Sequence, residues 1–196
     1  MAIPLSTAPC WSDLDAEAKR ARLLSSAGEV FAREGLDAPM PAIAAAAGAG
    51  IGSVYRQFPS KRDLLAALVI ERHEEVEKEV EAALGDPGGP WGALTTLLWA
   101  IAGRQASDDV LGEAMVTVSE HRDVLEAVAA TIHSLEALLD AAKAAGSLRA
   151  DATALDLRLL FAATRAAREL NSEAWRRMLE LGIDALRADA QDRAAR

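Results

Sequence analysis

Residues 39–62 constrain the fold more than any other part of the chain. Their sequence, PMPAIAAAAGAGIGSVYRQFPSKR, predicts two short helices separated by a tight glycine turn. Gly48 follows the first helix and reaches the left-handed conformation without a Cβ penalty, while Gly50 is an acceptable N-cap for the second. Pro59 then stops the second helix. Two short helices around such a turn are typical of a DNA-binding helix-turn-helix.

The second of these helices, expected over residues 51–58, has two different faces. Ile51, Val54 and Phe58 recur at helical spacing and are expected to face the protein interior. The other face carries small residues, hydrogen-bonding groups and a cation, namely Gly52, Ser53, Tyr55, Arg56 and Gln57. Small residues near a helix start allow a close approach to the major groove, and the polar groups can contact phosphates and base edges. We therefore predict that this face binds DNA.

A second helix start follows directly. Ser60 is a good N-cap, and Asp63 stands at the acidic third position of the helix that it opens. Lys61 lies beside that helix start, where a phosphate can be held. Tight turns and caps also occur in helical domains that do not bind DNA, which is the alternative interpretation of residues 39–62.

At this point the residues support a family resemblance. The string AGAGIGSVYRQFPSKRDLL resembles the second half of the DNA-binding domain of TetR-type transcriptional repressors. Residues upstream resemble the first helix of that domain, namely Arg22, Leu23, Leu24, Ala27, Phe31 and Gly35. The motif match covers roughly residues 19–68. The rest of the chain is similar to the family's variable ligand-binding and dimerisation domain in size and order only.

The resemblance implies which residues approach DNA and how the protein works. Tyr55 and Lys61 would contact phosphates, and Ser53 and Gln57 would lie nearer base edges or backbone. The implied partners are a double-stranded palindromic operator, a second copy of the chain in a homodimer, and an unknown small-molecule effector that releases a repressor. The implied function is transcriptional regulation without enzymatic activity.

Three positions depart from the family pattern. Pro39 stands where a capping Thr is usual, Gly50 stands where a capping Ser or similar residue is common, and Gln57 replaces a frequent His. Proline in a first helical turn remains compatible with a helix because that N–H has no intrahelical partner. Neither Pro39 nor Gly50 carries a side-chain hydroxyl that could contact a phosphate.

Charge is unevenly distributed along the chain. The net charge of −9 is unusual for a DNA-binding protein, which ordinarily has a basic footprint. Residues 1–62 contain seven Lys and Arg against six Asp and Glu, whereas residues 63–196 contain fourteen against twenty-four. The acidic excess therefore lies outside the motif, where Arg56, Lys61 and Arg62 can form a local basic patch.

Composition also limits the compartment and the chemistry. No apolar run approaches a membrane span and no signal peptide is evident at the N-terminus, so a cytoplasmic location is expected. Cys10 is the single cysteine, which excludes an intrachain disulfide and leaves a redox-sensing thiol as a minor alternative. We predict no cofactor, no metal site and no catalytic residue.

Helix-favouring residues dominate, and no strand-like alternation is present, so the predicted fold is all-α. An N-terminal three-helix domain with a helix-turn-helix is expected to be joined by a long helix to a C-terminal helical ligand and dimerisation domain. The predicted divisions are a tail (1–14), the DNA-binding domain (15–62), the effector and dimerisation domain (63–190) and a tail (191–196). Helices are expected over 15–34, 60–84, 91–105, 108–119, 121–145, 152–170 and 172–188.

An effector cavity among the later helices is expected from apolar residues that share faces with polar ones. The candidates for effector binding are Trp99, Arg104, Met115, Thr117, Leu135, Phe161 and Arg165. In the alternative interpretation the aromatic and aliphatic members are core residues and the arginines extend to solvent.

The last two helices carry apolar stripes with small residues, a pattern that favours a four-helix dimer contact. The candidate interface residues are Leu159, Ala163, Ala166, Met178, Leu179, Gly182 and Leu186, with Leu155, Ala162 and Ile183 on the same faces. The alternative is that these faces complete the core of the monomer.

The sequence fits two other classes of function less well. A helical enzyme lacks support because the sequence shows no nucleophile with a paired base, no spaced carboxylate dyad and no phosphate-binding Gly-rich loop. A helical interaction protein with weakened or lost DNA binding is the main alternative, and Pro39 and Gly50 are the features that favour it.

Overall fold

The computed structural model describes residues 10–107 and 109–188, and over these the chain is helical, which confirms the predicted all-α fold. A short 3-10 turn, η1, precedes nine α-helices in the described residues. In chain order the elements are η1 (Trp11–Asp13), α1 (Ala16–Glu34), α2 (Met40–Ala47), α3 (Ile51–Gln57), α4 (Lys61–Leu84), α5 (Pro90–Ser107), α6 (Asp109–Thr117), α7 (Arg122–Ala144), α8 (Ala154–Leu170) and α9 (Ala174–Leu186). The predicted tail 191–196 and most of the tail 1–14 lie outside the described residues.

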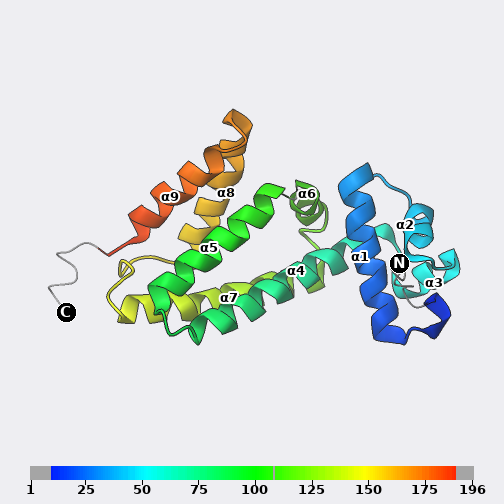
Figure 1. The fold of residues 1–196 in the computed structure, drawn as a ribbon, viewed down its shortest axis with the longest axis horizontal. Helices are drawn as coiled ribbons and strands as arrows, with labels where there is room; N and C mark the ends of the chain where they lie inside the picture. The colour runs from blue at the N-terminus through cyan, green and yellow to red at the C-terminus, as the bar shows by residue number, and fades with distance from the viewer. Residues whose placement is uncertain (1–9, 108, 189–196) are drawn as a thin grey trace, which may run out of the picture.

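α1, α2 and α3 lie together at one end of the elongated molecule (Figure 1). The Asp15 side chain caps α1 by accepting a 2.8 Å hydrogen bond from the Ala18 N–H, and Gly35 ends the helix at φ 78°. Gly48 ends α2 in the left-handed conformation at φ 66°, as predicted. Leu23, Phe31 and their neighbours form the first hydrophobic core against α2, α3 and the start of α4.

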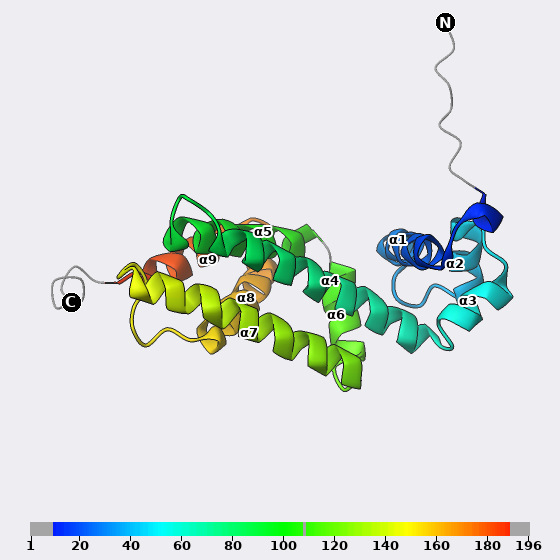
Figure 2. The same ribbon diagram turned by 90° about the horizontal axis from the view of Figure 1, so that it is seen from below.

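α4 extends from the first core into the second (Figure 2). Its start is fixed by a capping box, in which the Ser60 hydroxyl accepts from the Asp63 N–H and the Asp63 carboxylate accepts from the Ser60 N–H. The first half of α4 is buried against α1, and Val76 and Val80 belong to the second core. The first core also includes Ala114 and Val118 near the end of α6, so it extends past the predicted domain boundary at residue 62.

The second core lies among α4, α5, α7, α8 and α9. Its centre consists of leucines with almost no exposed surface, including Leu94, Leu98, Leu138, Leu157 and Leu179. Trp99 and Trp175 pack edge to face with ring centroids 6.0 Å apart, which joins α5 to α9. Burial on this scale supplies the main driving force for the second half of the fold.

α4 and α7 also share a partly buried polar network. The hydroxyl of Thr131 lies 3.0 Å from His73 Nδ1 and 3.1 Å from Glu77 Oε1. Burial lowers the pKa of the His73 imidazole, and the nearby Glu77 carboxylate opposes that effect. The folded protein therefore favours neutral His73.

The free energy of unfolding is expected to fall as the pH decreases through the ordinary pKa of histidine. The imidazole of His73 takes up a proton near pH 6.5 in the unfolded chain and at a lower pH in the folded protein. The stability that neutral His73 contributes is therefore complete above pH 6.5 and is lost as the pH falls below that value. A pKa difference of one unit corresponds to about 1.4 kcal/mol. Urea unfolding of wild type and His73→Gln between about pH 7.5 and 5.5 measures the effect.

The variant should lose part of the wild-type pH dependence. His133→Gln is the matched control because His133 is an exposed histidine on α7. Equal pH dependence in wild type and His73→Gln would contradict the prediction.

Candidate nucleic-acid interface

α3 lies at one end of the molecule (Figure 1) and carries the polar residues that were predicted to contact DNA. Val54 has no exposed surface and Phe58 only 2%, so these two residues hold α3 against the first core as predicted. Tyr55, Gly52 and Arg56 are exposed, while Ser53 and Gln57 are half-buried. Arg56 Nη2 donates a 2.9 Å hydrogen bond to Ser53 Oγ, which links two of the predicted contact residues on one turn.

Ile51 differs from the sequence-based expectation. It was expected to face the interior with Val54 and Phe58, but 41% of it is exposed. At the first position of α3 it lies one turn before Tyr55, which is 47% exposed, so the two share a face. Ile51 therefore belongs to the solvent-facing surface of α3. The sequence signal for this location was Gly50, which marks the start of the helix directly before Ile51.

Lys61 occupies the first position of α4, next to the C-terminal end of α3. Its ammonium group lies 5.8 Å from the centroid of the Phe31 ring, and Arg20 lies 4.9 Å from that of Phe58. Hydrogen bonds from Ser60 lower the pKa of the Asp63 carboxyl, followed by a smaller effect of His121. The carboxylate thus stays ionised while it caps the helix that begins with Lys61.

His121 connects this helix start to the second half of the molecule. It is the residue before α7, and its Nε2 lies 3.8 Å from Asp63 Oδ1. Its Nδ1 is buried and has no hydrogen-bond partner within the described part of the chain. The beginning of α7 is therefore in contact with the N-cap region of α4.

The residues predicted to bind an effector are divided between the two cores and the surface. Leu135 is buried in the second core, and Trp99 and Phe161 pack against it, whereas Met115 packs against the first core. Arg104 forms a 2.6 Å ion pair with Glu79 of α4. Thr117 and Arg165 are exposed.

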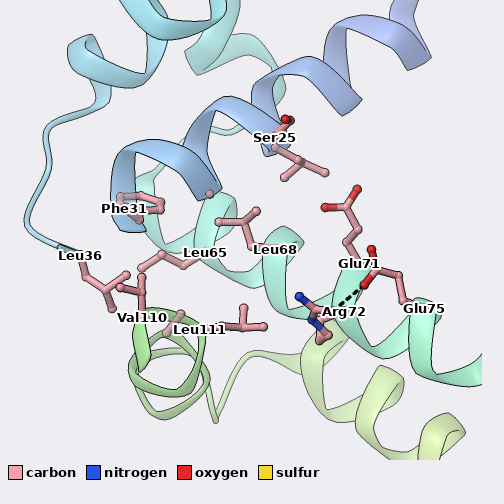
Figure 3. Close-up of a pocket in the computed structure, with 13 residues that line it drawn as sticks. Ser25, Phe31, Leu36, Leu65, Leu68, Glu71, Arg72, Glu75, Val110 and Leu111 are labelled. Carbon is pink, nitrogen blue, oxygen red and sulfur yellow. Dashed lines mark hydrogen bonds and ion pairs between the residues drawn. The ribbon is translucent and has the colours of Figure 1, made fainter. Parts of the chain in front are cut away.

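A cavity of about 190 Å³ lies between α1, α4 and α6 (Figure 3). Apolar groups form its walls, and a small polar cluster lies at one side. The lining residues are Leu24, Ser25, Gly28, Phe31, Leu36, Leu65, Leu68, Glu71, Arg72, Glu75, Val110, Leu111 and Ala114. None of the seven predicted effector residues is among them, because those residues lie on α5, α6, α7 and α8, whereas α1 and α4 supply most of the lining.

The residues predicted for a dimer interface divide into two groups. Leu179 and Leu186 lie in the core of the monomer, and Gly182 allows α9 to approach Leu160 of α8, where an added Cβ would lie 2.2 Å from Leu160 Cδ1. These locations match the alternative that the sequence left open. Leu159 and Ala166 are exposed, while Ala163 and Met178 are half-buried.

The exposed face of α8 carries more apolar surface than was predicted from the sequence. Leu155 is 58% exposed, Leu159 is 59% exposed and Leu170, which was not predicted, is 87% exposed. Together with Ala162 and Ala166 they form a stripe at helical spacing, here called the α8 stripe.

The described residues contain no group of His, Cys, Asp and Glu that could hold a metal ion. None of the helices in the described ranges is long and apolar enough to cross a membrane. The arrangement of α1, α2 and α3, with a solvent-facing second motif helix, is that of a helix-turn-helix DNA-binding protein.

Comparisons with known proteins define the family. The model of bacterial regulatory proteins of the tetR family matches residues 23–68, and that of the SbtR-like transcriptional regulator C-terminal domain matches residues 89–188. The chain belongs to the TetR family of transcriptional regulators, whose members are not enzymes. A comparison with curated proteins gave no match.

Solved structures agree with this assignment. A TetR transcription regulatory protein from Mycobacterium vanbaalenii is 32% identical, with a TM-score of 0.64 over 87% of this chain and 95% of that one. A TetR regulator from Streptomyces coelicolor is 29% identical, with a TM-score of 0.68 over 87% and 99%. FadR from Bacillus subtilis, solved with stearoyl-CoA, is 19% identical with a TM-score of 0.64 over 83% and 97%, and shares the fold.

Lys61→Ala is expected to weaken DNA binding about equally for all sequences. Loss of the phosphate contact predicted for Lys61 should also reduce the slope of log affinity against log salt by about 1. Fluorescence anisotropy with a labelled duplex over a salt series measures both quantities.

Lys78→Ala is the matched control, because Lys78 is an exposed lysine on the same helix about 25 Å further along its axis. The control should bind DNA like the wild type. An unchanged salt slope in Lys61→Ala would show that Lys61 does not contact a phosphate.

Proposed function

We propose that this TetR-family regulator is a cytoplasmic repressor that binds a palindromic operator as a homodimer and is released by a small-molecule effector. The observation that supports DNA recognition best is the exposed surface of α3 beside the capped start of α4. Tyr55 and Lys61 would hold phosphates, while Gly52, Ser53, Arg56 and Gln57 would lie in the major groove. Phosphate contacts fix the register, and groove contacts carry the sequence preference.

The acidic second half does not prevent this function. Arg56, Lys61 and Arg62 lie at the α3–α4 junction, whereas the excess of carboxylates lies after residue 62. Carboxylates more distant from the DNA than about 8–10 Å are largely screened at physiological salt. The affinity for DNA should therefore fall steeply as the salt concentration rises, and the affinity for non-specific DNA should be modest.

The α8 stripe supports a homodimer. A contiguous row of exposed leucines and alanines on one helix is typical of a helix–helix contact between two copies. Ala163 and Met178 lie at the edge of the exposed surface, while the buried residues of α9 hold α8 in place. A two-fold dimer places two α3 helices on one duplex, which is why an inverted repeat is expected.

Effector release requires a difference in affinity between two conformations. A ligand can shift the equilibrium between DNA-bound and released states only by its differential affinity for them. The contacts of α4 with both cores, and of His121 with Asp63, provide a connection between the two halves. In this proposal the effector contacts residues of the second half of the chain. The candidates are the residues predicted from the sequence, namely Trp99, Arg104, Met115, Thr117, Leu135, Phe161 and Arg165.

Selection from a random duplex library tests the DNA-binding part of the proposal. The purified full-length chain is incubated with the library at physiological salt, and the bound pool is sequenced. An enriched inverted repeat with half-sites about one helical turn apart, or a multiple of it, is expected. Folded protein that enriches no sequence would contradict the proposal and favour a helical interaction protein.

Leu159→Glu is expected to convert the dimer to a monomer. A carboxylate at the centre of an apolar contact loses its hydration without gaining a partner, so association should weaken by at least about 100-fold. Sedimentation velocity at micromolar concentration measures the change.

Leu84→Glu is the control, because Leu84 is 48% exposed but lies at the end of α4, outside α8 and α9. It should sediment like the wild type. A monomeric wild type, or a dimeric Leu159→Glu variant, would contradict the role of the α8 stripe.

A further inference from the structure

We infer that the cavity between α1, α4 and α6 is a binding site for a small organic ammonium ion with an apolar body, and that Glu71 recognises its charge. The cavity differs in location from the effector site predicted in the second half. Its regulatory consequence, but not the binding itself, rests on the proposed function.

The size and lining of the cavity favour a ligand of about one aromatic ring with a short side chain. Its volume is about 190 Å³, and a cavity of about 150 Å³ with apolar walls is sufficient for benzene. Phe31, Leu65 and Ala114 are almost completely buried and form an apolar wall. Leu68 and Val110 are partly buried and complete it from α4 and α6.

Gly28 is the strongest indication that the cavity holds a ligand. It lies in the middle of α1, where glycine is less stable than alanine, and a Cβ at this position would meet no atom within 4 Å. Neither close packing nor a positive φ therefore requires a glycine here. A larger side chain at residue 28 would instead fill the cavity that Gly28 lines.

The polar side of the cavity is acidic. Arg72 Nη1 donates a 2.8 Å hydrogen bond to Glu75 Oε2, so these two charges compensate each other (Figure 3). Glu71 forms no hydrogen bond or ion pair with another residue in the described ranges. Burial raises the pKa of the Glu71 carboxyl, and the carboxylates of Glu75 and Glu74 add to the effect, while Arg20 and Arg72 oppose it. A ligand cation beside Glu71 would offset the desolvation of its carboxylate and the repulsion from Glu74 and Glu75.

A ligand in this cavity would contact both halves of the molecule. α1 belongs to the DNA-binding unit, whereas α6 directly precedes the turn that leads to His121 and α7. A bound ligand would stabilise one distance between α1 and α6 over others. Because α1 and α3 share the first core, this distance would also affect the position of α3. We therefore expect the bound ammonium to lower the affinity for the operator.

Calorimetric titration without DNA tests the binding directly. The probes are 2-phenylethylamine, which is an ammonium ion at neutral pH, and 2-phenylethanol, a neutral molecule of similar shape. The wild type should bind the amine at least about fivefold more tightly than the alcohol. Glu71→Gln should bind both probes with similar affinity, because it keeps the shape and removes the charge.

Gly28→Leu tests the location. It should weaken binding of both probes by at least about tenfold, while its melting temperature is equal to or above that of wild type. Gly92→Leu in α5 is the matched control, since an added Cβ there also meets nothing within 4 Å and Gly92 does not line the cavity. Leu68→Trp fills the same space from α4 and replaces Gly28→Leu if that variant does not fold.

Each outcome decides a separate part of the inference. No binding of the amine by folded wild type up to about 10 mM, or undiminished binding by both cavity-filling variants, would overturn the site. Equal affinity for amine and alcohol in the wild type would overturn the role of Glu71. An amine that binds but leaves operator affinity unchanged would overturn the regulatory role, and failure of the library selection would overturn only the proposed function.

Discussion

The structure depends on the continuity of α4 between two hydrophobic cores. Leu64 and Val69 pack with α1 in the first core, and Val76 and Val80 pack with α5 and α7 in the second. The helix has 24 residues and is therefore about 36 Å long, with no proline that would bend it. Because the helix is continuous, a displacement of the second core would be transmitted along it to the start of α4. Any coupling between the two halves has to use this helix or the contacts beside it.

Much of the helical framework could be predicted because the signals are local. Gly35 and Gly48 end their helices at positive φ, and Ser60 with Asp63 forms the expected capping box. The long helix was expected over 60–84 and is observed as Lys61–Leu84. Caps and glycine turns depend on a few neighbouring residues, so they do not require knowledge of the tertiary packing.

Burial was harder to predict because periodicity shows which residues share a face but not what covers that face. Ile51 has the spacing of a core residue, yet the first turn of α3 extends beyond the core. Leu159 and Leu179 both belong to apolar stripes, and only the packing of α8 on α9 shows that one is exposed and the other buried. The cavity at Gly28 arises from α1, α4 and α6 together, so no single segment could reveal it.

The hydrogen bond between Arg56 and Ser53 means that free α3 already satisfies part of its proposed recognition surface. If the Nη2–H that bonds Ser53 is the group that contacts a base, this hydrogen bond has to be exchanged for one to DNA. The net gain is then a difference between two hydrogen bonds, not the value of a new one. On a DNA sequence that offers no acceptor at the right place, the hydrogen bond between Arg56 and Ser53 would stay formed. Such a sequence would gain no contact from this N–H, and α3 would lose little stability.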